Sequence, residues 1–149
     1  SGESIMLKLV RNILAVLAGA IIGGIVNMTI VMLGPSLISP PDGVDVANAE
    51  SLAKAIHLFE PRHFIMPFLA HALGTFVGAL AAYLIAASYK LQFAYFIGVL
   101  FLCGGIAACF MIPAPFWFMA LDVLLAYIPM AWLGIQAGSR LLRQKNIAE

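Results

Sequence analysis

The sequence predicts an all-α membrane protein, an up-and-down bundle of four transmembrane helices with both chain ends in the cytoplasm. Three observations support this fold class: the composition, four long apolar segments, and an uneven distribution of lysine and arginine. Of the 149 residues, 63% are hydrophobic and 10% are charged, and the mean hydropathy is +1.03. A soluble domain averages about 25% charged residues, so this chain could not cover its apolar surface in water. Residues 1–149 are therefore expected to form a single transmembrane domain.

Four apolar segments each have about the ~20 residues that cross a bilayer. The predicted spans are residues 9–33, 64–88, 93–111 and 116–138. Proline marks two of the boundaries, because it disrupts the helix around itself and restricts the residue before it. Gly34-Pro35 is expected to stop the first helix, and Pro113 and Pro115 separate the third from the fourth. Ser1-Gly2 looks like a remnant of tag cleavage.

Lysine and arginine indicate the orientation. Six of them fall on one side of the predicted spans, and two, Lys54 and Arg62, fall on the other. The six are Lys8, Arg11, Lys90, Arg140, Arg143 and Lys145. The positive-inside rule then places both termini in the cytoplasm and residues 35–63 in an outer loop. The short loops suit a multi-pass protein of a bacterial inner (plasma) membrane.

The outer loop is expected to contain a short amphipathic helix. Asp45 or Asn48 can cap its start, because a side-chain oxygen there accepts a backbone N–H of the first turn. Three apolar residues would share one face of this helix at helical spacing: Leu52, Ile56 and Phe59. The helix could lie on the membrane surface or cover the bundle. It could pack on its own helix ends or bind a partner protein.

Small residues recur four positions apart within the apolar segments. They form three pairs: Gly19 and Gly23, Gly74 and Gly78, and Gly134 and Gly138. In lipid such faces let two helix backbones approach closely, which supplies the association between helices. The glycine pairs are therefore expected at helix contacts, either within the chain or between copies of it.

Polar side chains inside the apolar segments mark a candidate binding site. Asn27, His71 and Asp122 come from three different spans and each lies about six or seven residues from the outer helix end, a depth of about 9–11 Å. Thr75 shares the face of His71. Ionisable groups at this depth usually pair with one another inside the bundle. The cluster is interpreted as a solute-binding or proton-exchanging site, or as a buried network that only holds the helices together.

No motif identifies a reaction, a cofactor or a metal site. The sequence has no phosphate-binding glycine loop, no H-E-x-x-H and no G-x-S-x-G, so no catalytic residue, no cofactor and no metal ligand is assigned. A formal charge of +1 argues against nucleic acid as a partner. Copper(I) remains a minor alternative, because Cys109 and five methionines lie toward the outer half. These are Met28, Met32, Met66, Met111 and Met119.

Two stretches carry a resemblance to a known family. One is residues 61–75, PRHFIMPFLAHALGT, and the other is residues 113–134, which contain PAPFWF, Asp122 and YIPMAWLG. Both resemble small, uncharacterised bacterial membrane proteins with four predicted spans. The resemblance implies the four-span fold and brings no activity and no functional residue with it.

Two functional hypotheses follow. The favoured one is a non-enzymatic accessory or binding protein of the inner membrane, whose partners are the lipid bilayer and either another membrane protein or further copies of itself. The alternative is a transporter or channel for a small solute or protons that uses the Asn27–His71–Asp122 cluster. Because four helices around one axis fill their centre with side chains, this alternative predicts a homo-oligomer. An intramembrane enzyme is the least favoured hypothesis.

Overall fold

The computed structural model describes residues 4–149, and Ser1 and Gly2 lie outside that range. Within it, four helical segments are long and apolar enough to cross a membrane: Ile5–Leu37, Pro61–Ile85, Lys90–Met111 and Phe116–Ala148. The all-α, four-span prediction is confirmed, and the protein is a polytopic membrane protein. Which membrane it occupies, and which side faces the cytoplasm, stay predictions.

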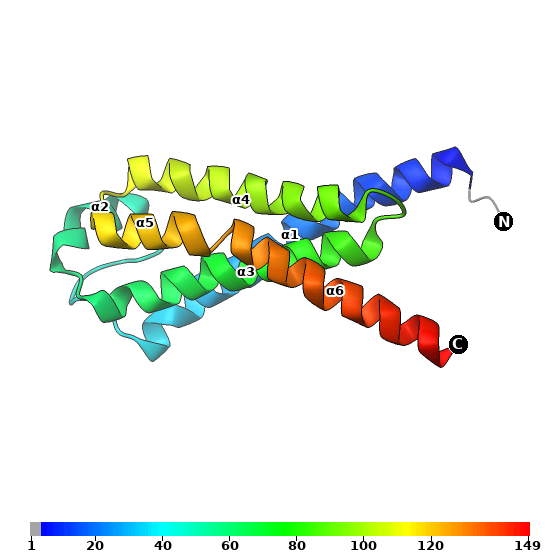
Figure 1. Ribbon diagram of the computed structural model, residues 1–149. Helices are drawn as coiled ribbons and strands as arrows, with labels where there is room; N and C mark the ends of the chain where they lie inside the picture. The colour runs from blue at the N-terminus through cyan, green and yellow to red at the C-terminus, as the bar shows by residue number, and fades with distance from the viewer. Residues whose placement is uncertain (1–3) are drawn as a thin grey trace.

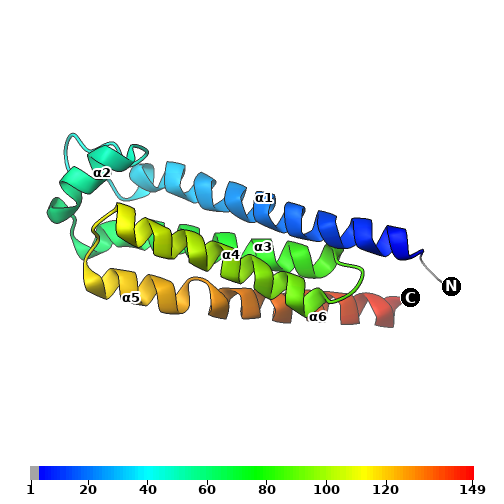
Figure 2. The same ribbon diagram turned by 90° about the horizontal axis from the view of Figure 1, so that it is seen from above.

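The helices run up and down in chain order (Figure 1). They are α1 (Ile5–Leu37), α3 (Ile65–Ile85), α4 (Lys90–Met111), and α5 (Phe116–Leu125) followed by α6 (Ile128–Ala148). The connection from α1 to α3 contains α2 (Ala49–Ala55) and two short 3-10 helices, η1 (Ile56–Leu58) and η2 (Pro61–Phe64). The start of α1 and the end of α6 lie at one end of the bundle, and α2 lies at the other (Figures 1 and 2).

Helix α3 is the central helix, in contact with α1, α4, α5 and α6. Its contact with α1 depends on glycine: a Cβ added at Gly19 would lie 2.8 Å from the carbonyl oxygen of Gly78, and one added at Gly23 would lie 2.7 Å from that of Gly74. On the other side, a Cβ at Gly134 of α6 would lie 2.6 Å from the Phe76 carbonyl oxygen. These glycine faces are occupied by helices of the same chain. Contacts between copies would therefore have to use other surfaces.

Helix α1 continues past the expected stop at Gly34-Pro35. Pro35 lies in its last turn, and the helix ends at Leu37 with the Ile38 N–H bonded to the Gly34 carbonyl at 2.8 Å. Proline this close to the C-terminal end removes one backbone hydrogen bond, to Val31, without stopping the turn that follows. At the other end of the chain, α6 extends beyond residue 138 through its basic residues to Ala148.

The fourth span is not one continuous helix. It divides at Ala126 and Tyr127, between the end of α5 and the start of α6. The physical cause is Pro129, which has no N–H to bond the Leu125 carbonyl and whose ring would clash with it in an unbroken helix. Ala126 still bonds to Asp122 at 2.9 Å, and Ala131 bonds to Tyr127 at 2.8 Å. The break therefore falls directly after Asp122's turn of helix.

The outer connection covers the end of the bundle, and we call residues 38–60 the lid. Its helix α2 is capped by Asn48, whose side-chain oxygen accepts the Ser51 N–H at 3.0 Å. Ile56 is buried together with Phe64 and Phe118, and Leu52 and Phe59 pack against this cluster. The three residues of the predicted apolar face thus point into the protein, toward η2 and α5. They do not share one helix as expected, because α2 ends at Ala55, Ile56 lies in η1 and Phe59 follows it.

Candidate functional site

His71 of α3 and Asp122 of α5 form an ion-pair contact at the level predicted from the sequence. His71 Nδ1 lies 2.8 Å from Asp122 Oδ1 and 3.0 Å from Oδ2. The Asp122 residue is only 3% exposed. An unpaired carboxylate would be very costly in such surroundings, so the imidazole is the partner that allows Asp122 to be there.

Tyr127 is a third member of this cluster. Its hydroxyl donates a hydrogen bond to Asp122 Oδ2 at 3.0 Å. Its ring also stacks against that of His71, with centroids 5.8 Å apart and an interplanar angle of 26°. Tyr127 thus holds both partners of the pair. We refer to His71, Asp122 and Tyr127 together as the triad, a name for their contacts only.

Gly105 of α4 provides the space that Tyr127 occupies. A Cβ at Gly105 would overlap the hydroxyl and the ring of Tyr127. The neighbouring Gly104 has no atom within 4 Å of the corresponding position. Gly105 therefore has a specific role in the triad, whereas Gly104 has no such contact.

With Asp122 as a carboxylate, its hydrogen bonds determine which atoms of the triad carry protons. A carboxylate only accepts hydrogen bonds, so both Tyr127 Oη and His71 Nδ1 carry the protons that they share with Asp122. His71 Nε2 has no hydrogen-bond partner among residues 4–149, and the side chain is 27% exposed. Nε2 is therefore free to accept a hydrogen bond when the ring is neutral, and to donate one when it is charged.

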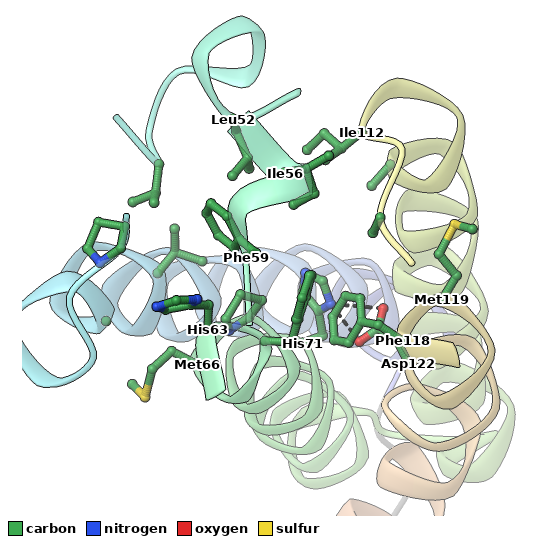
Figure 3. A pocket seen from close by; sticks show the side chains of 18 of the residues that line it. Leu52, Ile56, Phe59, His63, Met66, His71, Ile112, Phe118, Met119 and Asp122 are labelled. Carbon is green, nitrogen blue, oxygen red and sulfur yellow. Dashed lines mark hydrogen bonds and ion pairs between the residues drawn. The ribbon is translucent and has the colours of Figure 1, made fainter. Parts of the chain in front are cut away.

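A cavity of about 270 Å³ lies between the triad and the lid. Figure 3 shows His71 and Asp122 on one side of it, with Leu52, Ile56 and Phe59 of the lid opposite. Helices α1 and α4 contribute small and apolar residues to its walls, among them Val31, Gly34, Gly105 and Ala108. Among the described lining residues, Asp122 is the only acid, and none is a lysine or an arginine.

His63 lies between this cavity and the outer surface. It lines the cavity and also a more polar hollow, which Asp42, Glu60 and Arg62 line as well. The Glu60 N–H donates to His63 Nδ1 at 2.8 Å. Because Nδ1 accepts that hydrogen bond, the single proton of the ring is on Nε2. The cavity and the polar hollow share three lining residues, Ile38, Pro40 and His63, so the cavity adjoins the polar exterior there.

The four predicted site residues do not all converge. His71 and Asp122 meet, and Thr75 donates its hydroxyl proton to the His71 carbonyl at 2.8 Å. Asn27 lies against Gly74 of α3, since a Cβ at Gly74 would be 2.9 Å from the Asn27 Cβ. Neither Asn27 nor Thr75 lines the cavity. Asn27 therefore belongs to the contact between α1 and α3, and Thr75 makes its hydrogen bond within α3.

Sequence reasoning missed Tyr127, Gly105 and His63. On an unbroken helix, Tyr127 would point about 140° away from Asp122, so only the break before Pro129 brings it close. Pro129 was the available signal. His63 was visible as a histidine at the end of the outer loop, and its Glu60 neighbour three residues earlier is the spacing of a capping box.

The methionines and the cysteine that were considered as copper(I) ligands are dispersed in the structure. Met66 and Met119 line the cavity with Cys109, whereas Met28, Met32 and Met111 are exposed on the outside of the bundle. Within residues 4–149 there is no group of three or more His, Cys, Asp or Glu side chains that could hold a metal ion.

No protein-family model, curated protein or solved structure matches the chain. The site offers the partly exposed imidazole of His71, paired with the buried carboxylate of Asp122, in a small, mostly apolar cavity under the lid. Such an arrangement can bind a ligand through one polar contact and can exchange a proton with it.

Proposed function

We propose that this protein is a non-enzymatic binding protein of the membrane, whose cavity holds a small, mostly apolar ligand with one polar group in contact with His71. The observation that carries the proposal is the cavity of about 270 Å³, mostly apolar, with His63, His71 and Asp122 as its polar lining residues. Ligand sites are typically apolar hollows with a few convergent polar groups, and range from about 300 to 1,000 Å³. At about 270 Å³ this cavity lies just below that range, which suits a small ligand.

A purely structural role for the pair accounts for less of what is seen. A network that only joins α3 to α5 needs no adjoining cavity and no accessible nitrogen. Here the His71 side chain is 27% exposed and its Asp122 partner 4%. The exposed part of the His71 side chain thus lines a space that a ligand could fill.

Binding of a partner protein through the lid is also less well supported. Leu52, Ile56 and Phe59 were the candidates for an apolar contact face, and all three line the cavity. The apolar face therefore points into the protein and is not presented to a partner at the surface. Binding of a small molecule beneath the lid uses the same residues without uncovering them.

Catalysis by acyl transfer lacks the necessary contact. Cys109 lines the cavity and is the nearest candidate nucleophile. An activated thiol would be hydrogen-bonded to the imidazole that removes its proton, and within the described residues no hydrogen bond joins Cys109 to His71. Binding without reaction is the simpler proposal.

Filling the cavity tests the proposal. Ile56→Trp places a large ring into it, whereas Leu58→Trp, two residues further on, adds the same ring at an exposed position (53% exposed) that does not line the cavity. Native mass spectrometry of protein extracted in its own lipids is expected to show a bound small molecule in the wild type and in Leu58→Trp, but not in Ile56→Trp. Equal occupancy in both variants would place the ligand elsewhere.

A second candidate function is proton-coupled transport of a small solute, with this cavity as its outward-open site. Ionisable residues within membrane spans often mark proton pathways, and the His71–Asp122 pair is reached from the cavity. Both functions share the first step, binding beneath the lid. They differ in whether the ligand crosses the membrane, which uptake into sealed vesicles containing the protein distinguishes.

A further inference from the structure

We infer that the ligand is a small hydrophobic amine in its protonated, cationic form, and that its binding releases one proton from His71. This inference rests on the proposed function and names the chemical class of the ligand for the same cavity. It follows from the charges that line the cavity, from the proton positions in the triad, and from the size and polarity of the space.

Asp122 sets the charge balance of the cavity when no ligand is bound. Asp122 is buried and is the only acid among the described lining residues, which contain no lysine and no arginine. A buried carboxylate needs a positive partner in a medium of low dielectric constant. In the empty cavity a protonated His71 is the group in contact with Asp122 that can supply this charge. The pair is then neutral overall.

The other titratable groups around the pair do not supply that charge. Tyr127, from the junction of α5 and α6, gives its hydroxyl proton to Asp122. Cys109 of α4 carries no positive charge in either protonation state. His63 of η2 accepts the Glu60 N–H through Nδ1, which the charged form of its ring could not do. The α1 and α2 residues that line the cavity are Val31, Gly34, Pro35 and Leu52, none of which titrates.

Ligands of different charge therefore differ in what they do to the site. A carboxylate would add a second negative charge beside Asp122, and a neutral ligand would leave the pair as it is. An ammonium group can replace the imidazolium as the counterion. A cation is thus the one kind of ligand that lets His71 lose its proton without leaving Asp122 without a counterion, and we take this as the charge of the ligand.

The proton positions show how the exchange would proceed. The proton on His71 Nδ1 is held by Asp122 at 2.8 Å, so the proton that leaves is the one on Nε2. The vacated Nε2 lone pair then accepts an N–H of the ammonium group. In total, one cation and a protonated site give a cation-loaded site and one free proton, and the charge is the same before and after.

The size and the walls of the cavity limit the rest of the ligand. About 270 Å³ is the volume of about nine water molecules at ~30 Å³ each. Phe59, Phe64 and Phe118 line the space together with aliphatic side chains. A short alkyl chain or a single aromatic ring attached to the amine fits both the volume and the polarity.

Three probes of matched shape test the inference: phenethylammonium, 2-phenylethanol and phenylacetate. Binding to the purified protein in micelles is measured by titration calorimetry in two buffers of different ionisation enthalpy, with empty micelles subtracted. Phenethylammonium is expected to bind at least about tenfold more tightly than the other two. The buffer dependence of its binding heat is expected to show a net release of protons, approaching one per ligand.

Two variants locate the effect. Asp122→Asn is expected to lower the affinity for phenethylammonium about tenfold or more and to leave that for 2-phenylethanol within about twofold. Asp42→Asn makes the same chemical change at an exposed residue outside the cavity and is expected to bind all three probes as the wild type does. The comparison of probes on the wild type stands even if Asp122→Asn does not fold.

The outcomes separate the inference from the proposed function. If 2-phenylethanol or phenylacetate binds as tightly as phenethylammonium, and Ile56→Trp abolishes that binding, the cationic ligand class is wrong and the binding function stands. Binding of phenethylammonium without proton release overturns the exchange at His71. If none of the three probes binds, both the ligand class and the proposed cavity function fail.

Discussion

At the scale of single residues, the absence of a Cβ at Gly105 allows Tyr127 to reach Asp122. The Tyr127 hydroxyl occupies the space where a Cβ of residue 105 would be. Its hydrogen bond to Asp122 and its stacking on His71 both depend on that position. Gly105 therefore acts at a distance on the orientation of His71, the residue that faces the cavity.

The pair Gly104 and Gly105 offers a matched test of this role. Alanine at either position should improve helix propensity by up to about 1 kcal/mol. At residue 105 the overlap with Tyr127 and the loss of its hydrogen bond outweigh this gain, and we expect the free energy of unfolding to fall by about 1–3 kcal/mol. Thermal unfolding in micelles measures the difference. A Gly105→Ala protein as stable as Gly104→Ala would show that Tyr127 does not occupy this space.

The sequence located two of the site residues because polar groups inside apolar segments are conspicuous. It could not distinguish His71 and Asp122, which meet, from Asn27, which lies at a similar depth and packs on Gly74. Depth along each helix can be counted from the sequence, but the rotation of each helix about its axis is set by packing against its neighbours. Tyr127 was hidden by the assumption of an unbroken helix.

At the scale of elements, the contact between α1 and α3 depends on two facing glycine pairs. Gly19 and Gly23 of α1 lie against Gly78 and Gly74 of α3, with backbone atoms where side chains would otherwise be. Such close approach supplies van der Waals contact between helices that have no hydrophobic drive to associate in lipid. The remaining face of α1 is largely exposed, as its residues Leu17, Ile21 and Ile25 show.

Valine at Gly19 or at Gly24 tests this contact within one helix. Both changes impose a similar β-branched propensity effect, but only Gly19 lies against α3, and Gly24 has no atom within 4 Å of an added Cβ. Gly19→Val is expected to lower the free energy of unfolding by about 1–3 kcal/mol relative to Gly24→Val. Equal stability of the two variants, by the same thermal measurement, would contradict the α1–α3 packing described here.

Two prolines show why element boundaries are harder to predict than elements. Pro35 was expected to stop α1 and instead lies in its last turn. Pro129 falls inside the predicted span 116–138 and marks the division between α5 and α6. The local effect on hydrogen bonding is the same at both. What differs is how much helix follows, and that depends on contacts made by residues further along the chain.

At the scale of the whole molecule, the four spans and their order were predictable because hydropathy records which segments avoid water. The central position of α3 was not predictable, although its contacts with α1, α4 and α6 are the most extensive in the bundle. Each apolar segment carries small residues, and the sequence does not say which small-residue faces meet. The lid was predicted as a short amphipathic helix, while its inward packing against Phe64 and Phe118 required the structure.

The distribution of basic residues predicts the orientation across the membrane. We expect residues 35–63 outside and both ends of the chain inside, because six of the eight basic residues lie on the side of the termini. Glu50 and Arg143 are exposed residues at opposite ends. In a background with Cys103 and Cys109 replaced by alanine, Glu50→Cys should react with a membrane-impermeant maleimide in intact cells, and Arg143→Cys should react only after permeabilisation. The reverse labelling pattern would show that the protein has the opposite orientation in the membrane.

The close fit of α1 on α3 also bears on how the protein is made. Translation delivers these two helices before α4, α5 and α6, and their glycine faces allow them to pair in the lipid without the rest of the chain. Asp122 of α5 enters the membrane after His71 of α3. Inserting a charged side chain at the centre of a helix costs about 2.5–3.5 kcal/mol. His71 is by then already in the membrane, on a helix that has paired with α1. Asp122 can therefore form its contact with His71 as soon as α5 inserts.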